Sequence, residues 1–150
     1  MNRLYKVANA RDDLRGDPRC ARLLELVRRR CRAFRAREVA NVVHGLGVLC
    51  AGKGVGDVDV ETAGDLMRAM ERNAGMLKAQ EVSNVYNGLT KLPAAAAATS
   101  PERWRRIAEA ASRLAPEMNS QNIAITLNAL GKIDAAERAV SSGAGWSRLI

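Results

Sequence analysis

The chain of 150 residues is long enough for one modest hydrophobic core and short for two independent domains. Aromatic residues make up only 3% of it, and Ala, Arg, Leu and Glu are plentiful, a composition that favours helices over sheet. The net charge is +8, and no apolar run approaches the roughly 18–20 residues of a membrane span. We therefore expect a soluble all-α protein with no membrane partner.

The positive charge is concentrated at one end of the chain. Residues 1–37 carry twelve Lys and Arg against four Asp and Glu, whereas residues 38–150 carry twelve of each sign. This polarity indicates a polyanionic partner near the basic end, most simply a nucleic acid.

The first predicted unit is a pair of helices over residues 17–49. Asp17 and Pro18 supply an N-cap and a first helical residue. Apolar residues then follow at intervals of four, four and three, which is one face of a helix; they are Leu23, Val27, Cys31 and Phe34. We name this segment an A helix. The B helix that follows begins at Arg37, and its core stripe is Val39, Val43 and Leu46.

The same unit recurs at registers of 43 and then 41 residues, as repeat 2 over residues 59–92 and repeat 3 over residues 100–133. Asp59 and Ser100-Pro101 again supply N-caps. The equivalent A positions are Leu66/Ile107, Met70/Ala111, Ala74/Ala115 and Leu77/Met118, and the equivalent B stripes are Val82/Tyr86/Leu89 and Ile123/Leu127/Leu130. Residues 50–58 and 93–99 are predicted loops. The fold class is therefore an α-solenoid of stacked antiparallel hairpins with a period of about 42 residues.

Both ends of the chain follow the same register. Residues 1–9 resemble the end of a B helix, and we interpret them as the tail of a preceding repeat. Residues 134–150 contain Trp146, 42 residues after Trp104, and we interpret them as the start of a further repeat. Frayed ends that match by chance are the alternative interpretation.

The B helices carry small residues beside the core stripe and polar residues opposite it. Ala40/Ser83/Ala124 on one flank and Gly45/Gly88/Ala129 on the other are expected to let neighbouring helices approach closely, because Gly within a helix is otherwise unfavourable. The opposite face predicts a polar stripe for RNA contact, since amides suit base edges; it contains Asn41, His44, Gln80, Asn84, Asn87, Lys91, Gln121, Asn128 and Lys132. Hydrogen bonding to loops or neighbouring helices is the alternative role.

Six arginines lie near the turn between the first A and B helices, with no acidic residue among them; they are Arg28, Arg29, Arg30, Arg32, Arg35 and Arg37. Phosphate attachment is the functional interpretation and a solvated helix face is the alternative. The same two interpretations apply to Arg29, Arg72 and Arg113, which recur in register. Arg105 and Arg106 are balanced by neighbouring glutamates, so a solvated face is expected there.

Nothing in the sequence predicts an enzyme, a metal site or a cofactor. The chain has a single histidine, no phosphate-binding loop motif and no cluster with metal-ligand spacing. The three cysteines at 20, 31 and 50 form no CxxC pair, so they are expected to be packing residues in a reducing compartment.

The B helices resemble those of the octotricopeptide and heptatricopeptide repeat families, which often precede a RAP domain. The likeness rests on residues 81–92 and 119–133, close to a Gln-x-(Ile/Val)-Ala-Asn-x-x-x-Ala-Leu-x-Lys-Leu signature. It implies a solenoid that binds single-stranded RNA or rRNA in mitochondria, or in plastids, and acts in RNA maturation, stability or translation or within a divergent ribosome alongside other proteins.

The chain departs from that pattern at several positions. Its period is longer, Ile125 stands where Asn41 and Asn84 stand, and Gly45 and Gly88 replace the common Ala. Residues 90–93, Thr-Lys-Leu-Pro, are also similar to the repeat ending of large effector proteins of plant-pathogenic bacteria. A protein–protein interaction segment of such an effector, with a host protein as its target, is therefore the alternative function.

Overall fold

The computed structural model describes residues 17–50 and 58–133, and these residues form helices and turns without any strand. The A helices are α2 (Pro18–Arg30), α4 (Val60–Asn73) and α7 (Pro101–Leu114), and the B helices are α3 (Ala36–Cys50), α5 (Ala79–Leu89) and α8 (Ser120–Leu130). The predicted hairpins and their order are thereby confirmed. The predictions for residues 1–9 and 134–150 lie outside the described residues.

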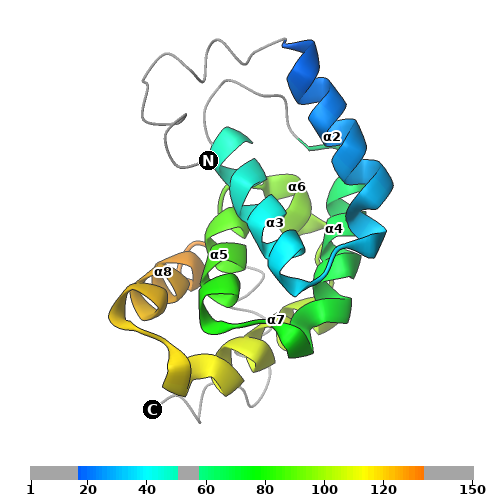
Figure 1. The fold of residues 1–150 in the computed structure, drawn as a ribbon. Coiled ribbons are helices and arrows are strands. Elements are labelled where there is room, and N and C mark those ends of the chain that lie inside the picture. Colours follow the sequence, from blue (N-terminus) through cyan, green and yellow to red (C-terminus); the bar gives the residue numbers. More distant parts are fainter. Residues whose placement is uncertain (1–16, 51–57, 134–150) are drawn as a thin grey trace.

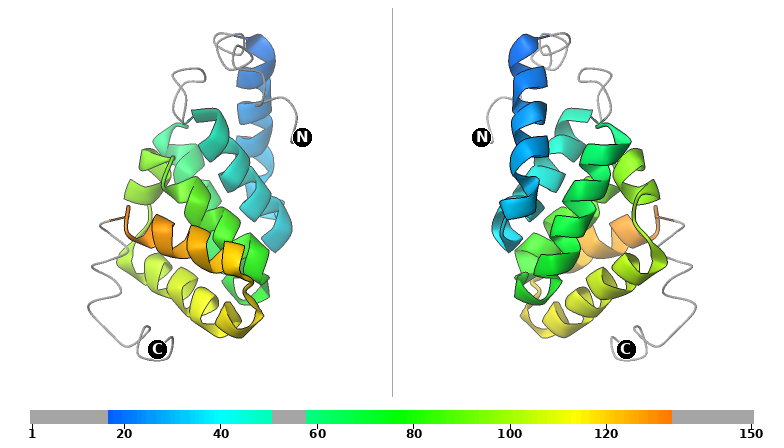
Figure 2. Two further views of the ribbon diagram at one scale, coloured as in Figure 1. Left: turned by 90° about the vertical axis from the view of Figure 1, so that its left-hand side faces the viewer. Right: turned by 90° about the vertical axis from the view of Figure 1, so that its right-hand side faces the viewer.

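The hairpins stack into two layers. Figure 1 shows the B helices α3, α5 and α8 following one another on one side, with the A helices on the other. The two side views in Figure 2 show each helix beside its equivalent in the next repeat. The protein is thus an all-α stack of antiparallel helical hairpins, as the repeat pattern predicts.

The A helices begin where the capping signals predict. The Asp17 carboxylate accepts a hydrogen bond from the backbone N–H of Arg19 at 2.8 Å, and Asp59 accepts one from Thr62 at 2.8 Å. Ser100 does the same through its hydroxyl oxygen at 3.3 Å. Each cap satisfies a backbone donor that the first helical turn leaves unpaired.

The A helices end one turn earlier than the apolar spacing predicts. A short 3-10 turn follows each of them, namely η2 (Cys31–Ala33), η3 (Ala74–Met76) and η4 (Ala115–Glu117). The residue after each turn, Phe34, Leu77 or Met118, is extended rather than helical. The spacing of three residues arises here from the tighter 3-10 geometry and an extended residue, both of which still direct these side chains to the core.

The segment before the third repeat differs from the prediction of a loop. Residues 93–97 form a short helix, α6 (Pro93–Ala97), that packs against α4 and α5. Ala95 in this helix is fully buried. The run of alanines favours this helix because Ala has the highest helix propensity of all residues.

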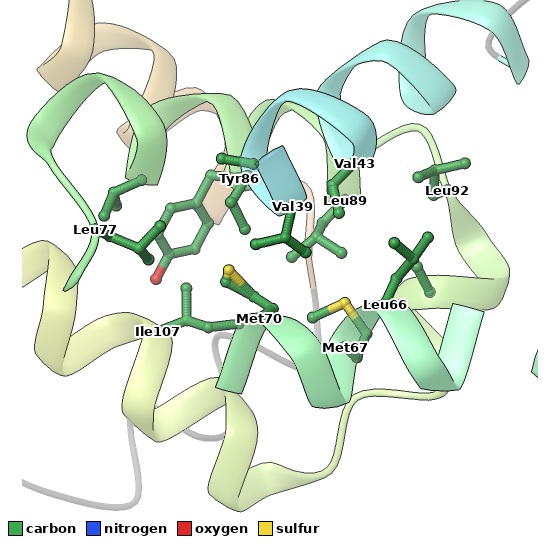
Figure 3. Close-up of a cluster of buried hydrophobic side chains, with 14 of the residues drawn as sticks. Val39, Val43, Leu66, Met67, Met70, Leu77, Tyr86, Leu89, Leu92 and Ile107 are labelled. Atoms are coloured by element: carbon green, nitrogen blue, oxygen red, sulfur yellow. The ribbon is translucent and has the colours of Figure 1, made fainter. Parts of the chain in front are cut away.

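The core lies between the two layers. Val39 and Val43 from α3 meet Leu66 and Met70 from α4, as Figure 3 shows, and all four side chains are fully buried. In the next repeat, Val82 and Tyr86 of α5 occupy the equivalent buried positions, and α5 packs against α7. Figure 3 shows Tyr86 beside Ile107 of α7. Each B stripe therefore packs against the A helix of the following repeat.

The prediction that Ile123 and Leu127 are core residues is wrong for the described structure. Their side chains are 43% and 55% exposed, whereas Leu130 is buried. The cause is positional, because among the described residues no A helix follows α8. Leu23, the first position of the predicted A stripe, is likewise 60% exposed, because no described B helix precedes α2.

Two glycines bring the first two B helices into backbone contact. A Cβ atom placed on Gly88 would lie 2.5 Å from the carbonyl oxygen of Val43, and one on Gly47 would lie 2.7 Å from that of Gly88. Gly45, which the repeat register pairs with Gly88, has no such neighbour within 4 Å. The expected close packing of helices is therefore confirmed at Gly88 and wrong for Gly45. Gly47, which was not predicted, also makes such a contact.

The A helices are linked by long side chains instead. Arg72 donates to the carbonyl oxygen of Arg32 at 2.9 Å, and Arg113 donates to that of Ala74 at 3.3 Å. Both arginines therefore reach the 3-10 turn of the preceding repeat, a structural role that neither predicted interpretation included. The B helices therefore pack more closely than the A helices: α3 and α5 touch through their backbones, whereas the A helices are bridged by long side chains.

Candidate nucleic-acid interface

The polar stripe lies on the face of the B layer opposite the core, across all three B helices. Each of its residues is at least partly exposed, as expected for a face opposite the core. The fully exposed members are Asn41, Gln80, Gln121, Asn128 and Lys132, and the half-buried ones are His44, Asn84, Asn87 and Lys91. Equivalent positions of successive repeats thus form one continuous band.

A hydrogen-bonded pair crosses between two helices within this stripe. Nδ2 of Asn87 on α5 lies 3.4 Å from Nδ1 of His44 on α3. Burial, followed by the positive charge of Lys91, holds the pKa of His44 below its usual range. At neutral pH the imidazole is therefore uncharged, and either it or the amide can serve as donor or acceptor toward a ligand.

The stripe contains no acidic side chain. The nearest acids on the B helices are Glu38 and Glu81 in their first turns, and both are used as caps. Glu38 accepts from the backbone N–H of Arg35 at 2.7 Å, and Glu81 accepts from that of Lys78 at 3.0 Å. The face accordingly combines amides, one imidazole and cations, which is compatible with a polyanion. Ile125 interrupts it in the third repeat and is half-buried.

Half of the arginine cluster has acidic partners. Glu25 accepts hydrogen bonds from Arg28 at 3.0 Å and from Arg29 at 2.7 Å, which lowers the pKa of the Glu25 carboxyl. Arg32 lies 3.5 Å from Asp65, a buried carboxylate whose pKa is lowered first by Arg68 and then by Arg32. These three arginines therefore have acidic partners in the structure, although no acid lies within the run itself.

The remaining three arginines are exposed on either side of the turn between the first A and B helices: Arg30 ends α2, and Arg35 and Arg37 lie at the start of α3. Arg30, Arg35 and Arg37 have no acidic partner among the residues that the structure describes. Arg35 precedes α3 and Arg37 lies in its first turn, so both stand near the N-terminal end of the polar stripe. The cluster and the stripe are thus continuous only through Arg35 and Arg37.

The acids that pair with the cluster were missed by sequence reasoning. Glu25 lies three and four residues before Arg28 and Arg29, the spacing of neighbours on a helix, and that local signal was available. Asp65 belongs to the next repeat and gave no local signal. The expectation for Arg105 and Arg106 is confirmed, because Glu102 pairs with both of them.

The described part of the chain gives little evidence for other kinds of site. There, no three His, Cys, Asp or Glu residues gather in a way that would hold a metal ion. None of the helices within residues 17–50 and 58–133 has both the length and the apolarity to cross a membrane. Cys31 is buried, which raises the pKa of its thiol, and Cys20 is half-buried; both are free thiols.

These features define the class of the protein as a helical-repeat α-solenoid. The sequence profile of a family described as a protein of unknown function (DUF1601) matches residues 21–43, 64–85 and 103–127, so the chain is similar to that family. Each match spans most of one A helix and the first part of its B helix, which agrees with the repeat register. No curated protein and no solved structure matches the chain.

Proposed function

We propose that this chain is an RNA-binding helical-repeat scaffold whose polar B-helix face holds single-stranded RNA or rRNA. The observation that carries the proposal is the exposed, acid-free polar band that runs across α3, α5 and α8 at equivalent positions. Asn and Gln side chains offer a donor and an acceptor side by side, which matches the edges of nucleobases. One such set per repeat is how other helical-repeat arrays read RNA.

The cations at the edges of the band supply attachment to phosphates. Arg35 and Arg37 stand at one end of the first B helix, and Lys91 and Lys132 follow the C-terminal ends of the next two. Arg30 adds a fifth cation near the same turn. The resemblance to octotricopeptide and heptatricopeptide repeats supports the same function and extends it to mitochondria, with plastids as the other location, and to RNA processing or a divergent ribosome.

Fluorescence anisotropy with a labelled single-stranded RNA across a salt series tests the proposal. About five phosphate contacts predict a log–log slope of affinity against salt of roughly −3 to −4. Replacing Asn84 and Asn87 together by Ala removes two central amides and should weaken binding at every salt concentration without changing that slope. Binding that is weak and independent of salt would refute direct RNA recognition.

A matched pair of charge variants distinguishes binding at the B layer from binding at the A layer. Changing both Arg35 and Arg37 to Ala should reduce the magnitude of the slope by roughly 1.4, the value for two phosphates on a single strand. Changing Arg105 and Arg106 to Ala removes the same charge from α7 in the A layer, where Glu102 already pairs with both. This control should leave the slope unchanged.

The second candidate is a protein–protein interaction scaffold, such as a repeat segment of a bacterial effector. It is favoured by Ile125, an aliphatic residue within the polar band, and by the half of the arginine cluster that has acidic partners. In that case partner proteins co-purify with the chain and remain bound after RNase treatment. Loss of the complex on RNase treatment favours the RNA-binding function instead.

A further inference from the structure

The two ends of the described stack expose positions that are buried inside it. At the α8 end, Ile123 and Leu127 are exposed, although the equivalent residues of α3 and α5 are fully buried by the A helix of the following repeat. Among the described residues, the α8 end therefore presents a B-helix surface that no A helix covers. Ala124, in the small-residue position beside it, is exposed as well.

At the α2 end, the exposed residues are those that a B helix covers in the other repeats. Leu23 and Leu26 are exposed there, 60% and 42% respectively, whereas their equivalents in α4 and α7 are buried against the B helix of the preceding repeat. Gly45 on α3 has open space around it, although its equivalent Gly88 touches a neighbouring backbone. Within residues 17–50 and 58–133, this end therefore presents an A-helix surface, with a small flank beside it, that no B helix covers.

The polar contacts between repeats show the same deficit. Arg72 and Arg113 each donate to a carbonyl of the 3-10 turn in the preceding repeat. Their equivalent Arg29 bonds to Glu25 within its own helix. At the other end, the 3-10 turn η4 receives no arginine from any described helix. Among the described residues, the α2 end thus holds an arginine, Arg29, without the carbonyl acceptor that its equivalents use. The α8 end holds the corresponding carbonyl groups, those of η4, without an arginine donor.

We propose that copies of this chain stack end to end, with the α8 face of one copy against the α2 face of the next. The contact continues the interfaces that already join the repeats: Ile123 and Leu127 pack on Leu23 and Leu26, and Arg29 reaches η4 of the neighbouring copy. A single chain carries both complementary surfaces, so a second copy suffices as the partner. Such a contact joins unlike faces and leaves one free at each end, so it builds open chains rather than closed dimers.

Light scattering and sedimentation of the nuclease-treated full chain, over a wide range of concentration, test the proposal. The average mass should rise with concentration past that of a dimer. Leu127→Arg and Leu23→Arg each block one face, and each variant alone should be monomeric. When the two variants are mixed, the intact α2 face of one meets the intact α8 face of the other, so the mass should double and then stop.

A control distinguishes this contact from nonspecific association. Met76→Arg changes an equally exposed apolar residue in the middle repeat and should leave association unchanged. Circular dichroism establishes that each variant retains its helices. A chain that is monomeric at every concentration overturns the proposal, as does one that stops at a dimer or a variant mixture that fails to pair. If the chain is monomeric and Leu127→Arg also lowers its melting temperature, the α8 face is already covered within one copy, and the proposal is likewise overturned.

Discussion

The contact between α3 and α5 and the contact between α5 and α8 occupy the same repeat positions but differ in chemistry. In the first, Gly47 and Gly88 bring two backbones together. In the second, the hydroxyl of Ser83 lies 3.2 Å from the carbonyl oxygen of Asn122 and 3.3 Å from the hydroxyl oxygen of Thr126. The first interface is closed by backbone contact at its glycines, beside the contact of His44 with Asn87, and the second by hydrogen bonds of buried hydroxyls.

The register makes this difference explicit. Ser83 and Thr126 of the second interface correspond to Ala40 and Val85 in the first, and all four are buried. The repeat therefore constrains the size of the side chains at these buried positions but not their polarity. A buried hydroxyl is tolerated at this position because a carbonyl of the neighbouring helix accepts from it.

The largest effect is expected at Gly88. In Gly88→Ala the new Cβ meets the backbone of Val43, which cannot move aside as a flexible side chain would. We expect a loss of about 2 kcal/mol or more in the free energy of unfolding, since such overpacking outweighs the gain in helix propensity. Urea denaturation followed by circular dichroism measures it.

Gly45→Ala is the matched control at the equivalent position of the first repeat. Nothing lies within 4 Å of its Cβ position, so the same substitution should stabilise the chain by about 0.5–1 kcal/mol through helix propensity alone. Equal effects at both positions would contradict the backbone contact that distinguishes the first interface.

A smaller effect is expected in the second interface. Ser83→Ala removes a buried hydroxyl that bridges α5 and α8, and it should cost about 1 kcal/mol. Combining it with Thr126→Val tests the contact between the two hydroxyls in a double-mutant cycle. Strictly additive losses would show that the two side chains do not interact across the interface.

The buried hydroxyl of Tyr86 should behave in the opposite way. Tyr86 is stacked on Trp104 with ring centroids 6.5 Å apart, and its hydroxyl is buried without a hydrogen-bond partner. Burial also raises the pKa of the phenol well above its usual value. Tyr86→Phe should therefore leave stability unchanged or raise it by up to roughly 1 kcal/mol. A clear loss of stability in thermal unfolding would mean that the hydroxyl has a partner.

The smallest expected effect is a pH dependence at the first interface, where His44 meets Asn87. The folded state lowers the pKa of His44, so the unfolded chain binds a proton more readily. Stability is therefore complete above the ordinary histidine pKa of about 6.5 and decreases as the pH falls below it. His44→Asn, which installs the residue of the other two repeats, should remove this dependence from denaturation curves measured across that range.

The repeat itself and the helix starts were predictable because their causes are local. Capping by Asp17, Asp59 and Ser100 depends on residues two or three positions away, and the apolar periodicity depends on a single helix. The exposure of Ile123 was not predictable in this way, because whether a stripe is buried depends on the presence of the next hairpin. Gly47 was missed because the alignment singled out recurring glycines, and its contact uses a position that is Thr90 in the second repeat.

The candidate interface was likewise predictable where its causes are local and unpredictable where they involve a neighbouring hairpin. The polar stripe could be placed because any residue opposite the core of a helix must face outward. The ion pairs of the arginine cluster could not all be predicted, because Arg32 pairs with Asp65 on the next hairpin. Arg72 and Arg113 were assigned to phosphate or solvent for the same reason, since their carbonyl acceptors belong to the preceding turn.

Burial by the neighbouring hairpin, rather than within a hairpin, also determines where the molecule opens first. The helices α4 and α5 have partners on both sides, whereas α2 and α8 each have a described neighbour on one side only. In a linear array with nearest-neighbour coupling, opening starts at the outer units and moves inward. Amide hydrogen exchange should accordingly be slowest in α4 and α5, and the middle repeat should keep its protons longest.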